Sequence, residues 1–287
     1  MNGSRRRFAD SALGMFALAL WLTYVGFFLV SPLLLIASYS LSGRDFQGGI
    51  EGTWSLQGWA DLFTYPVLIV LLRSTMMATG ATILCALIGV PFALSIHGST
   101  ARSQRMWRLL LATPLTLNAL LVAYSWQLLL GNAGMINSFL IKMRIRDEPL
   151  PLLYNAFAVF LGLLTAYLPF FTIAFLSSLD RIDPGYIIAS QSLGGGRWST
   201  IWRVIIPMAR PGLAGGAAIV FLPCFAEFVI PDLLGGGKVF LVGSLAHFAF
   251  YDGRNWPMGA ALMLLTVFGL SLAMIPAIRL FRGVFAS

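Results

Sequence analysis

The chain has 287 residues and a formal net charge of +8, and 58% of its residues are hydrophobic whereas only 10% are charged. About a quarter of an ordinary soluble domain is charged, so this composition excludes that class and predicts a membrane protein. Cys85 and Cys224 lie in apolar runs, where small core residues are expected, so neither a disulfide framework nor a metal site is predicted.

Long uncharged runs alternate with short polar segments along the whole chain. A helix needs roughly 20 apolar residues to cross the hydrocarbon core of a bilayer. Five of the runs exceed that length, and a sixth does so when Glu227 is included. The predicted spans are residues 12–38, 66–96, 109–130, 152–178, 211–234 and 257–278. We therefore expect residues 1–287 to form one all-α transmembrane domain with six spans.

The segments outside the spans are short. The basic cluster Arg5–Arg7 precedes an apolar stretch far longer than the ~7–15-residue core of a signal peptide, so an uncleaved first span is expected. Aromatic residues near Pro66 suit a helix at the membrane interface. A short outside helix is predicted around Met135–Met143, and residues 235–256 are interpreted as a Gly-rich outside loop.

The basic residues sort by side of the membrane. One side has Arg5, Arg6, Arg7, Arg102, Arg105, Arg108, Arg181, Arg197, Arg203, Arg210, Arg279 and Arg282. The other side has fewer basic residues, interspersed with acidic ones. The excess of arginine predicts that the first side is cytoplasmic and that both termini lie there. Because the charge is distributed over loops, no nucleic-acid partner is expected.

A polar, helix-forming insert at residues 179–210 separates the fourth and fifth spans. Asp183 followed by Pro184 is typical of an N-cap and a first helical residue. Gly194–Gly196 would end this helix, because glycine adopts positive φ at low cost. A second helix is predicted from Arg197. Its apolar stripe consists of Trp198, Ile201, Trp202 and Ile205. These features alone suit either an interfacial amphipathic element or a docking loop.

The insert resembles the cytoplasmic loop of permease subunits of binding-protein-dependent ABC importers. In that family Glu-Ala-Ala is followed by three further residues and then a glycine, and Ile-x-Leu-Pro comes later. The matching positions here are Ile188–Ser190, Gly194 and Ile205–Pro207, so the glutamate, the second alanine and the leucine are replaced. The insert also falls where the family places its loop, between the two spans before the last.

This resemblance implies a six-span bundle of the type I ABC importer permease kind, with a cytoplasmic coupling helix between spans four and five. The residues implied in ATPase coupling are Ala189, Ser190, Leu193, Gly194, Arg197 and Trp198. The implied partners in a bacterial inner membrane are a second permease, two ATP-binding subunits and a periplasmic solute-binding protein, with lipid around the spans.

Energy conversion is expected in the partner subunits. The only lysines, Lys142 and Lys238, lie outside any Walker A pattern, so this chain is not expected to cradle ATP phosphates. We therefore expect a transport subunit that is not an enzyme and has no cofactor of its own, with ATP and Mg²⁺ bound by the ATPases.

Within the permease family, the chain is most similar to the spermidine/putrescine group. The segments Glu227–Gly236 and Arg254–Ala261 carry this resemblance, which extends over about Gly26–Arg279. It implies a polyamine-like cationic solute. Related permeases serve opines, amino-acid derivatives and phosphonates, which are the alternative solutes.

Glu227 is the candidate polar group of the pathway. A carboxylate in a span costs several kcal/mol unless it faces protein or a water-filled cavity. Glu227 therefore either pairs with a bundle cation such as Arg73 or lines the pathway and attracts a cationic solute. Pro231 is expected to break the helix and expose carbonyl groups.

Tyr124, Trp126 and Tyr167 are candidates for an aromatic wall that holds a cation. Packing within the bundle explains these aromatic residues equally well.

Two other classes of membrane protein would show different patterns. An ion-driven secondary transporter would place ionisable groups in several spans and show repeat symmetry. An intramembrane enzyme would need paired catalytic groups at membrane depth. One carboxylate within a span, without an evident repeat, favours the importer.

Overall fold

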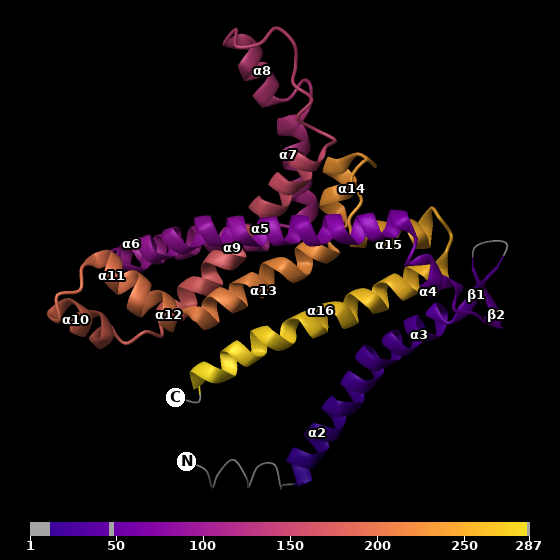
Figure 1. Cartoon of the computed structure of the whole chain (residues 1–287), viewed down its shortest axis with the longest axis horizontal. Coiled ribbons are helices and arrows are strands. Elements are labelled where there is room, and N and C mark those ends of the chain that lie inside the picture. The colour runs from indigo at the N-terminus through magenta and orange to yellow at the C-terminus, as the bar shows by residue number, and fades with distance from the viewer. Residues whose placement is uncertain (1–11, 46–48, 286–287) are drawn as a thin grey trace. The chain divides into compact units, whose positions relative to one another are not determined.

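The computed structural model describes residues 12–45 and 49–285 and is almost entirely helical (Figure 1). This confirms the predicted all-α class. The chain divides into two compact units, the first within residues 1–64 and 248–265 and the second within residues 65–247 and 266–287.

The first unit begins with a long apolar helix made of α2 (Ala12–Val25), the π-helical turn η1 (Gly26–Val30) and α3 (Ser31–Ser40). Large apolar side chains such as Phe16, Trp21 and Phe27 are exposed along it. In lipid a helix satisfies its own backbone hydrogen bonds, and exposed apolar side chains suit the hydrocarbon. The apolar helix Gly14–Ser40 matches the predicted first span closely.

An antiparallel hairpin follows, which the sequence did not predict. It consists of β1 (Ser42–Arg44) and β2 (Ile50–Trp54), and the short helix α4 (Gln57–Asp61) comes next. The Arg44 guanidinium donates to the carbonyl oxygens of Gly253 at 2.9 Å and Arg254 at 3.1 Å. These bonds fix the hairpin to the segment that precedes α16 (Trp256–Phe285).

Three long helices form the centre of the second unit (Figure 1): α5 (Tyr65–His97), α9 (Ala156–Leu179) and α13 (Arg210–Ala226). The first two match predicted spans two and four to within a few residues. Gly212 and Gly216 of α13 lie against α9, where a Cβ on Gly212 would overlap the side chain of Ser178. Small residues spaced by four let membrane helices approach closely, so α13 packs directly on α9.

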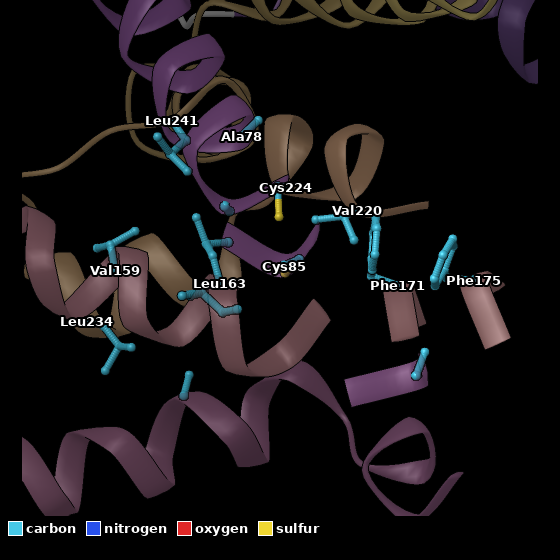
Figure 2. Close-up of a cluster of buried hydrophobic side chains, with 14 of the residues drawn as sticks. Ala78, Cys85, Val159, Leu163, Phe171, Phe175, Val220, Cys224, Leu234 and Leu241 are labelled. Atoms are coloured by element: carbon cyan, nitrogen blue, oxygen red, sulfur yellow. The ribbon is translucent and has the colours of Figure 1, made fainter. Parts of the chain in front are cut away.

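The core between these helices is apolar and tightly packed (Figure 2). Phe171 and Phe175 of α9 are fully buried, with ring centroids 6.4 Å apart, and Val220 of α13 belongs to the same cluster. Cys85 and Cys224 are free thiols within this core. Both are thus small buried residues, as their apolar sequence context predicted.

The predicted third span, residues 109–130, is not one continuous helix. It contains the end of α6 (Ala101–Ala112), the 3₁₀ turn η2 (Thr113–Thr116) and α7 (Ala119–Leu130), and the predicted short helix α8 (Met135–Lys142) follows. Pro114 has no N–H for an α-helical bond, and the Asn118 side chain accepts from Leu120 N at 3.2 Å to start α7 afresh.

The predicted fifth span, residues 211–234, is also interrupted. α13 ends at Ala226 and α14 (Val229–Gly235) begins after an extended Glu227 with φ −66° and ψ 137°. Pro231 explains the position of the break, since a proline cannot donate to the carbonyl four residues earlier and its ring clashes with that group. The expected break is confirmed and lies at Glu227 rather than at Pro231.

The region predicted as a Gly-rich loop contains a further helix, α15 (Val242–Tyr251). The Val242 N–H, at its start, donates to Ser74 Oγ of α5 at 2.9 Å. This buried hydrogen bond satisfies one of the N–H groups that a helix N-terminus leaves without an internal partner.

Four described helical stretches are long and apolar enough to cross a membrane: Gly14–Ser40, Tyr65–His97, Ala119–Lys142 and Ala156–Leu179. The bent pair Arg197–Met208 and Arg210–Ala226 makes a fifth if it is one span, and the described part of α16 adds a shorter apolar helix, Trp256–Leu272. The count of six spans stays a prediction.

Candidate functional site

The insert after α9 begins with the predicted capped helix, α10 (Pro184–Ser192). The Asp183 carboxylate accepts a hydrogen bond from the Gly185 N–H at 2.8 Å. Asp183 is therefore the N-cap and Pro184 the first helical residue, which confirms the local prediction.

The predicted glycine turn is present at the end of α10. Gly194 has φ +80°, and its N–H donates to Gln191 O at 3.0 Å, while Gly195 N–H donates to Ser190 O at 2.9 Å. This pair of bonds is the Schellman arrangement, which needs a left-handed residue at Gly194. A Cβ on Gly195 would lie 2.6 Å from Ser190 O, so the second glycine is also required sterically.

A second helical stretch returns to the bundle as α11 (Arg197–Thr200), the π-helical turn η3 (Ile201–Ile205) and α12 (Ile206–Met208). It meets α13 at an angle of 66°. Ser190 Oγ and Thr200 Oγ1 are 2.9 Å apart and Thr200 is buried, so this hydrogen bond holds the two helices of the insert together.

The insert carries an apolar surface that the described part of the chain leaves uncovered, at one end of the α5–α9–α13 bundle (Figure 1). Leu193 is 90% exposed and Trp198 is 73% exposed. Among the other predicted coupling residues, Ala189, Gly194 and Arg197 are exposed and Ser190 is half-buried. We call this surface the tip, defined as Ala189, Ser190, Leu193, Gly194, Arg197 and Trp198.

The predicted apolar stripe of the second helix is divided by the structure. Trp198 and Trp202 are exposed, whereas Ile205 packs against the core. The π-helical turn lies between them and changes the angular spacing of the side chains. Ile188, which stands where the family has glutamate, is exposed beside the tip.

The carboxylate of Glu227 is held at the break between α13 and α14. Its Oε2 accepts a hydrogen bond of 2.5 Å from the Tyr167 hydroxyl of α9. Its Oε1 accepts from the N–H groups of Phe228 and Val229, both at 3.1 Å. With 9% of its surface exposed, Glu227 is a buried acid whose two oxygens both have donors.

The structure does not support the alternative in which Arg73 pairs with Glu227. Among the described side chains, no lysine or arginine nitrogen lies within 4.0 Å of this carboxylate. The expected exposure of carbonyl groups at the break stays a prediction. Gly243 of α15 lies so close to the carbonyl groups of Ala226 and Glu227 that a Cβ there would overlap them.

The three aromatic candidates do not form one wall. The Trp126 indole N–H of α7 donates to Thr165 Oγ1 at 2.8 Å. Thr165 and Tyr167 are two residues apart on α9 and so point about 200° apart around it. Trp126 is therefore anchored away from the Tyr167–Glu227 pair, and Tyr124 is roughly half exposed on α7.

One polar cluster was missed by sequence reasoning. The Arg108 guanidinium of α6 donates to both oxygens of Asp180, each at 2.8 Å, and His97 Nδ1 lies 3.5 Å from Asp180 Oδ1. The hydrogen bonds from Arg108 are the main reason that the pKa of Asp180 is lowered. The only sequence signal for this cluster was the position of Asp180, an acidic residue at the end of a span on the side rich in arginine. Within the described residues, no group of His, Cys, Asp or Glu side chains is arranged to hold a metal ion.

Comparison with known proteins adds to this geometry. Residues 86–284 match the family described as binding-protein-dependent transport system inner membrane component. The spermidine/putrescine transport system permease protein PotB of Haemophilus influenzae is 33% identical over 243 residues, covering 85% of each chain. PotB of Escherichia coli K12 is 32% identical over 247 residues, covering 85% of this chain and 90% of the relative.

Solved structures agree at the level of the fold. A chain of a bacterial alginate ABC transporter, in complex with a periplasmic protein bound to an alginate pentasaccharide, aligns with a TM-score of 0.78 over 97% of both chains. The sequence identity is 14%, so this likeness concerns the arrangement of the helices alone.

Proposed function

Because the chain belongs to the family of binding-protein-dependent transport system inner membrane components, we propose that it conducts a polyamine-like cation through the bacterial inner membrane as the permease subunit of an ABC importer. One observation carries this proposal: relatives named as spermidine/putrescine permeases are about one-third identical over 85% of the chain. The alginate transporter chain shares the arrangement of the helices.

The proposed complex contains a second permease subunit, two ATP-binding subunits and a periplasmic solute-binding protein. ATP and Mg²⁺ belong to the ATP-binding subunits, because neither lysine of this chain lies in a phosphate-binding loop. The arginine-rich segments, both termini and the tip face the cytoplasm. The exposed Leu193 and Trp198 supply apolar surface that a bound ATPase would bury.

Closure of the ATPases on nucleotide would displace the tip. The insert that carries the tip would move as a unit, because the Gly194 turn and the Ser190–Thr200 hydrogen bond fix its two helices relative to each other. The insert is connected to α9 at one end and to α13 at the other. Displacement of the tip would therefore move both helices and change the access of the pathway.

Glu227 is the proposed contact for the cation, with Tyr167 beside it; Trp126 is anchored away from this pair and is not part of the contact. Three donors leave one lone-pair site of this carboxylate free, on Oε2, and an ammonium group would gain both charge attraction and a hydrogen bond there. An anionic phosphonate would be repelled, so the buried acid favours a polyamine over that alternative.

The test is uptake into proteoliposomes that contain the complete complex and its binding protein. Labelled putrescine and spermidine are compared with an opine, an amino-acid derivative and a phosphonate. Each solute is tested with and without ATP on the side of the membrane that carries the ATPases. We expect saturable, ATP-dependent uptake of a polyamine. ATP-dependent uptake of another solute alone would refute the polyamine assignment, and uptake driven by an ion gradient without ATP would refute the importer.

A further inference from the structure

The Arg108–Asp180 pair lies at the point where α9 passes into the insert. Asp180 caps α9, its N–H donating to Leu176 O at 3.1 Å, and only Arg181 and Ile182 separate it from the N-cap of α10. Asp180 is thus the last residue held by α9 before the tip. This short connection is the attachment of α10 to the bundle on the α9 side.

The geometry of the pair fixes orientation as well as distance. Both guanidinium nitrogens Nη1 and Nη2 bond to the carboxylate at 2.8 Å, which is the bidentate fork that arginine forms with planar acids. The Arg108 and Asp180 side chains are 41% and 35% exposed, and exposed ion pairs contribute little to stability. The pair is therefore better suited to holding two elements in register than to stabilising the fold.

The helix that carries Arg108 is otherwise attached by partly buried apolar contacts, in which the Trp107 ring packs edge-on against Phe92 of α5 and Leu111 packs against the core. Within the described structure α6 buries none of its residues, and Met106, Leu109 and Leu110 are exposed. Its polar ties run to the end of α5, since Gln104 Nε2 donates to the carbonyl oxygen of His97 at 2.9 Å. Arg108 gives α6 its charged connection to α9.

We propose that Arg108 and Asp180 are positioning residues that transmit displacement of the tip to α6, and this inference rests on the proposed function. From α6 the chain continues through η2 to α7, which packs against α14. α14 starts at the break where Glu227 is held. The pair thus joins the ATPase-facing segment to α14, beside the proposed cation site, along a route that leaves α9 at Asp180 and continues through α6 and α7.

The experiment compares variants in the complete reconstituted complex, measuring uptake, ATP hydrolysis and the amount of ATPase that co-purifies. Asp180→Asn and Arg108→Gln remove one charge each, and the exchange Arg108→Asp with Asp180→Arg restores an opposite pair. Arg105→Gln is the matched control, one turn away on the same helix and exposed. Arg108→Lys retains the charge but loses the bidentate fork.

We expect each single variant to keep its ATPase and to hydrolyse ATP, while the solute transported per ATP falls about 5-fold or more, a typical size for coupling between sites. Arg108→Lys should fall between these variants and the unaltered complex. The exchanged pair should recover part of the lost ratio, and Arg105→Gln should leave it unchanged.

An unchanged ratio in both single variants would overturn the inference. So would a loss that Arg105→Gln shares equally, or one that neither the exchanged pair nor Arg108→Lys reduces. Failure of the proposed function is distinguishable, because it shows in the unaltered complex as absent ATP-dependent uptake, and the inference would then fall with it.

Discussion

Tyr167 donates a 2.5 Å hydrogen bond to Glu227 and thereby joins α9 to the end of α13. The same carboxylate caps α14 through the N–H groups of Phe228 and Val229. One acidic side chain thus connects three helices at the break. A change at this position can therefore act on solute binding, on the geometry of the break, or on both. Comparing variants of Glu227 and Tyr167 separates the effect on binding from the effect on geometry.

For Glu227→Gln we expect weaker polyamine uptake with normal membrane insertion. Glutamine has the same shape and can still accept from the backbone N–H groups, but it loses the negative charge that attracts the cation. Hydrogen bonds to charged groups contribute about 1.5–3 kcal/mol, so kcat/KM for uptake should fall roughly 10- to 100-fold. Glu148→Gln, at an exposed loop acid, is the control. Unchanged kinetics would demote Glu227 to a structural cap.

Tyr167→Phe removes the hydroxyl donor and leaves the ring. We expect a smaller loss of uptake than for Glu227→Gln, because the backbone donors still hold Oε1. The double variant should lose less than the sum of the two single effects, since both changes act on one hydrogen bond. Strict additivity of the uptake kinetics would show that Tyr167 acts independently of Glu227.

Gly194 requires a left-handed backbone, so its substitutions should differ by residue type. Gly194→Val is expected to distort the turn, because φ +80° is strained for a β-branched residue by roughly 1–2 kcal/mol. Gly194→Asn should be tolerated, since asparagine adopts this conformation more readily. Gly194→Asp adds a charge at the tip and should abolish transport with normal insertion. Full uptake by the aspartate variant would refute the coupling role.

Leu193→Asp should break association with the ATPase while leaving the fold of the permease intact. Leu193 is almost fully exposed, so its replacement costs little within this chain, but a carboxylate would be buried without a partner in the proposed interface. The measurement is the yield of ATPase that co-purifies. Ile145→Asp, at an exposed position in the loop after α8, is the matched control and should co-purify normally. Equal yields for both variants would contradict the docking surface.

The ion pair of Asp180 predicts a dependence on pH. Its pKa is lowered in the folded protein, mainly by Arg108, so it binds protons less readily folded than unfolded. Its contribution to stability is therefore present above the unfolded carboxyl pKa of about 3.9 and is lost as pH falls through the lower folded value. The difference in thermal midpoint between the protein and Asp180→Asn should be small, because the pair is exposed, and it should hold from neutral pH to about pH 4 and shrink below it. A difference that already disappears near pH 6 would contradict this assignment.

The sequence was most informative where local physical chemistry decides the structure. The uncharged runs around α5 and α9 located these helices to within a few residues, and Asp183 and Gly194 marked the ends of α10. Interruptions were harder to predict. Pro231 indicated a break, but the chain breaks four residues earlier, at Glu227, whose carbonyl oxygen would need an N–H donor at position 231. The restart of the helix at Asn118 was not evident because the surrounding run is uniformly apolar.

Contacts between distant segments were not predictable from pattern. Arg108 and Asp180 are 72 residues apart, and neither residue type nor spacing indicates the pairing. Tyr167 and Glu227 were each chosen as candidates, but their hydrogen bond depends on how α9 packs against α13. The roles of the tip and of the pathway residues stay predictions that the experiments above address.

The two glycines of α13 have a mechanical consequence. Gly212 and Gly216 bring α13 against α9 beside the very ends from which the insert leaves and returns. The close packing at these glycines leaves no space for α9 and α13 to move apart at these ends. A force applied at Leu193 would therefore tilt α9 and α13 together.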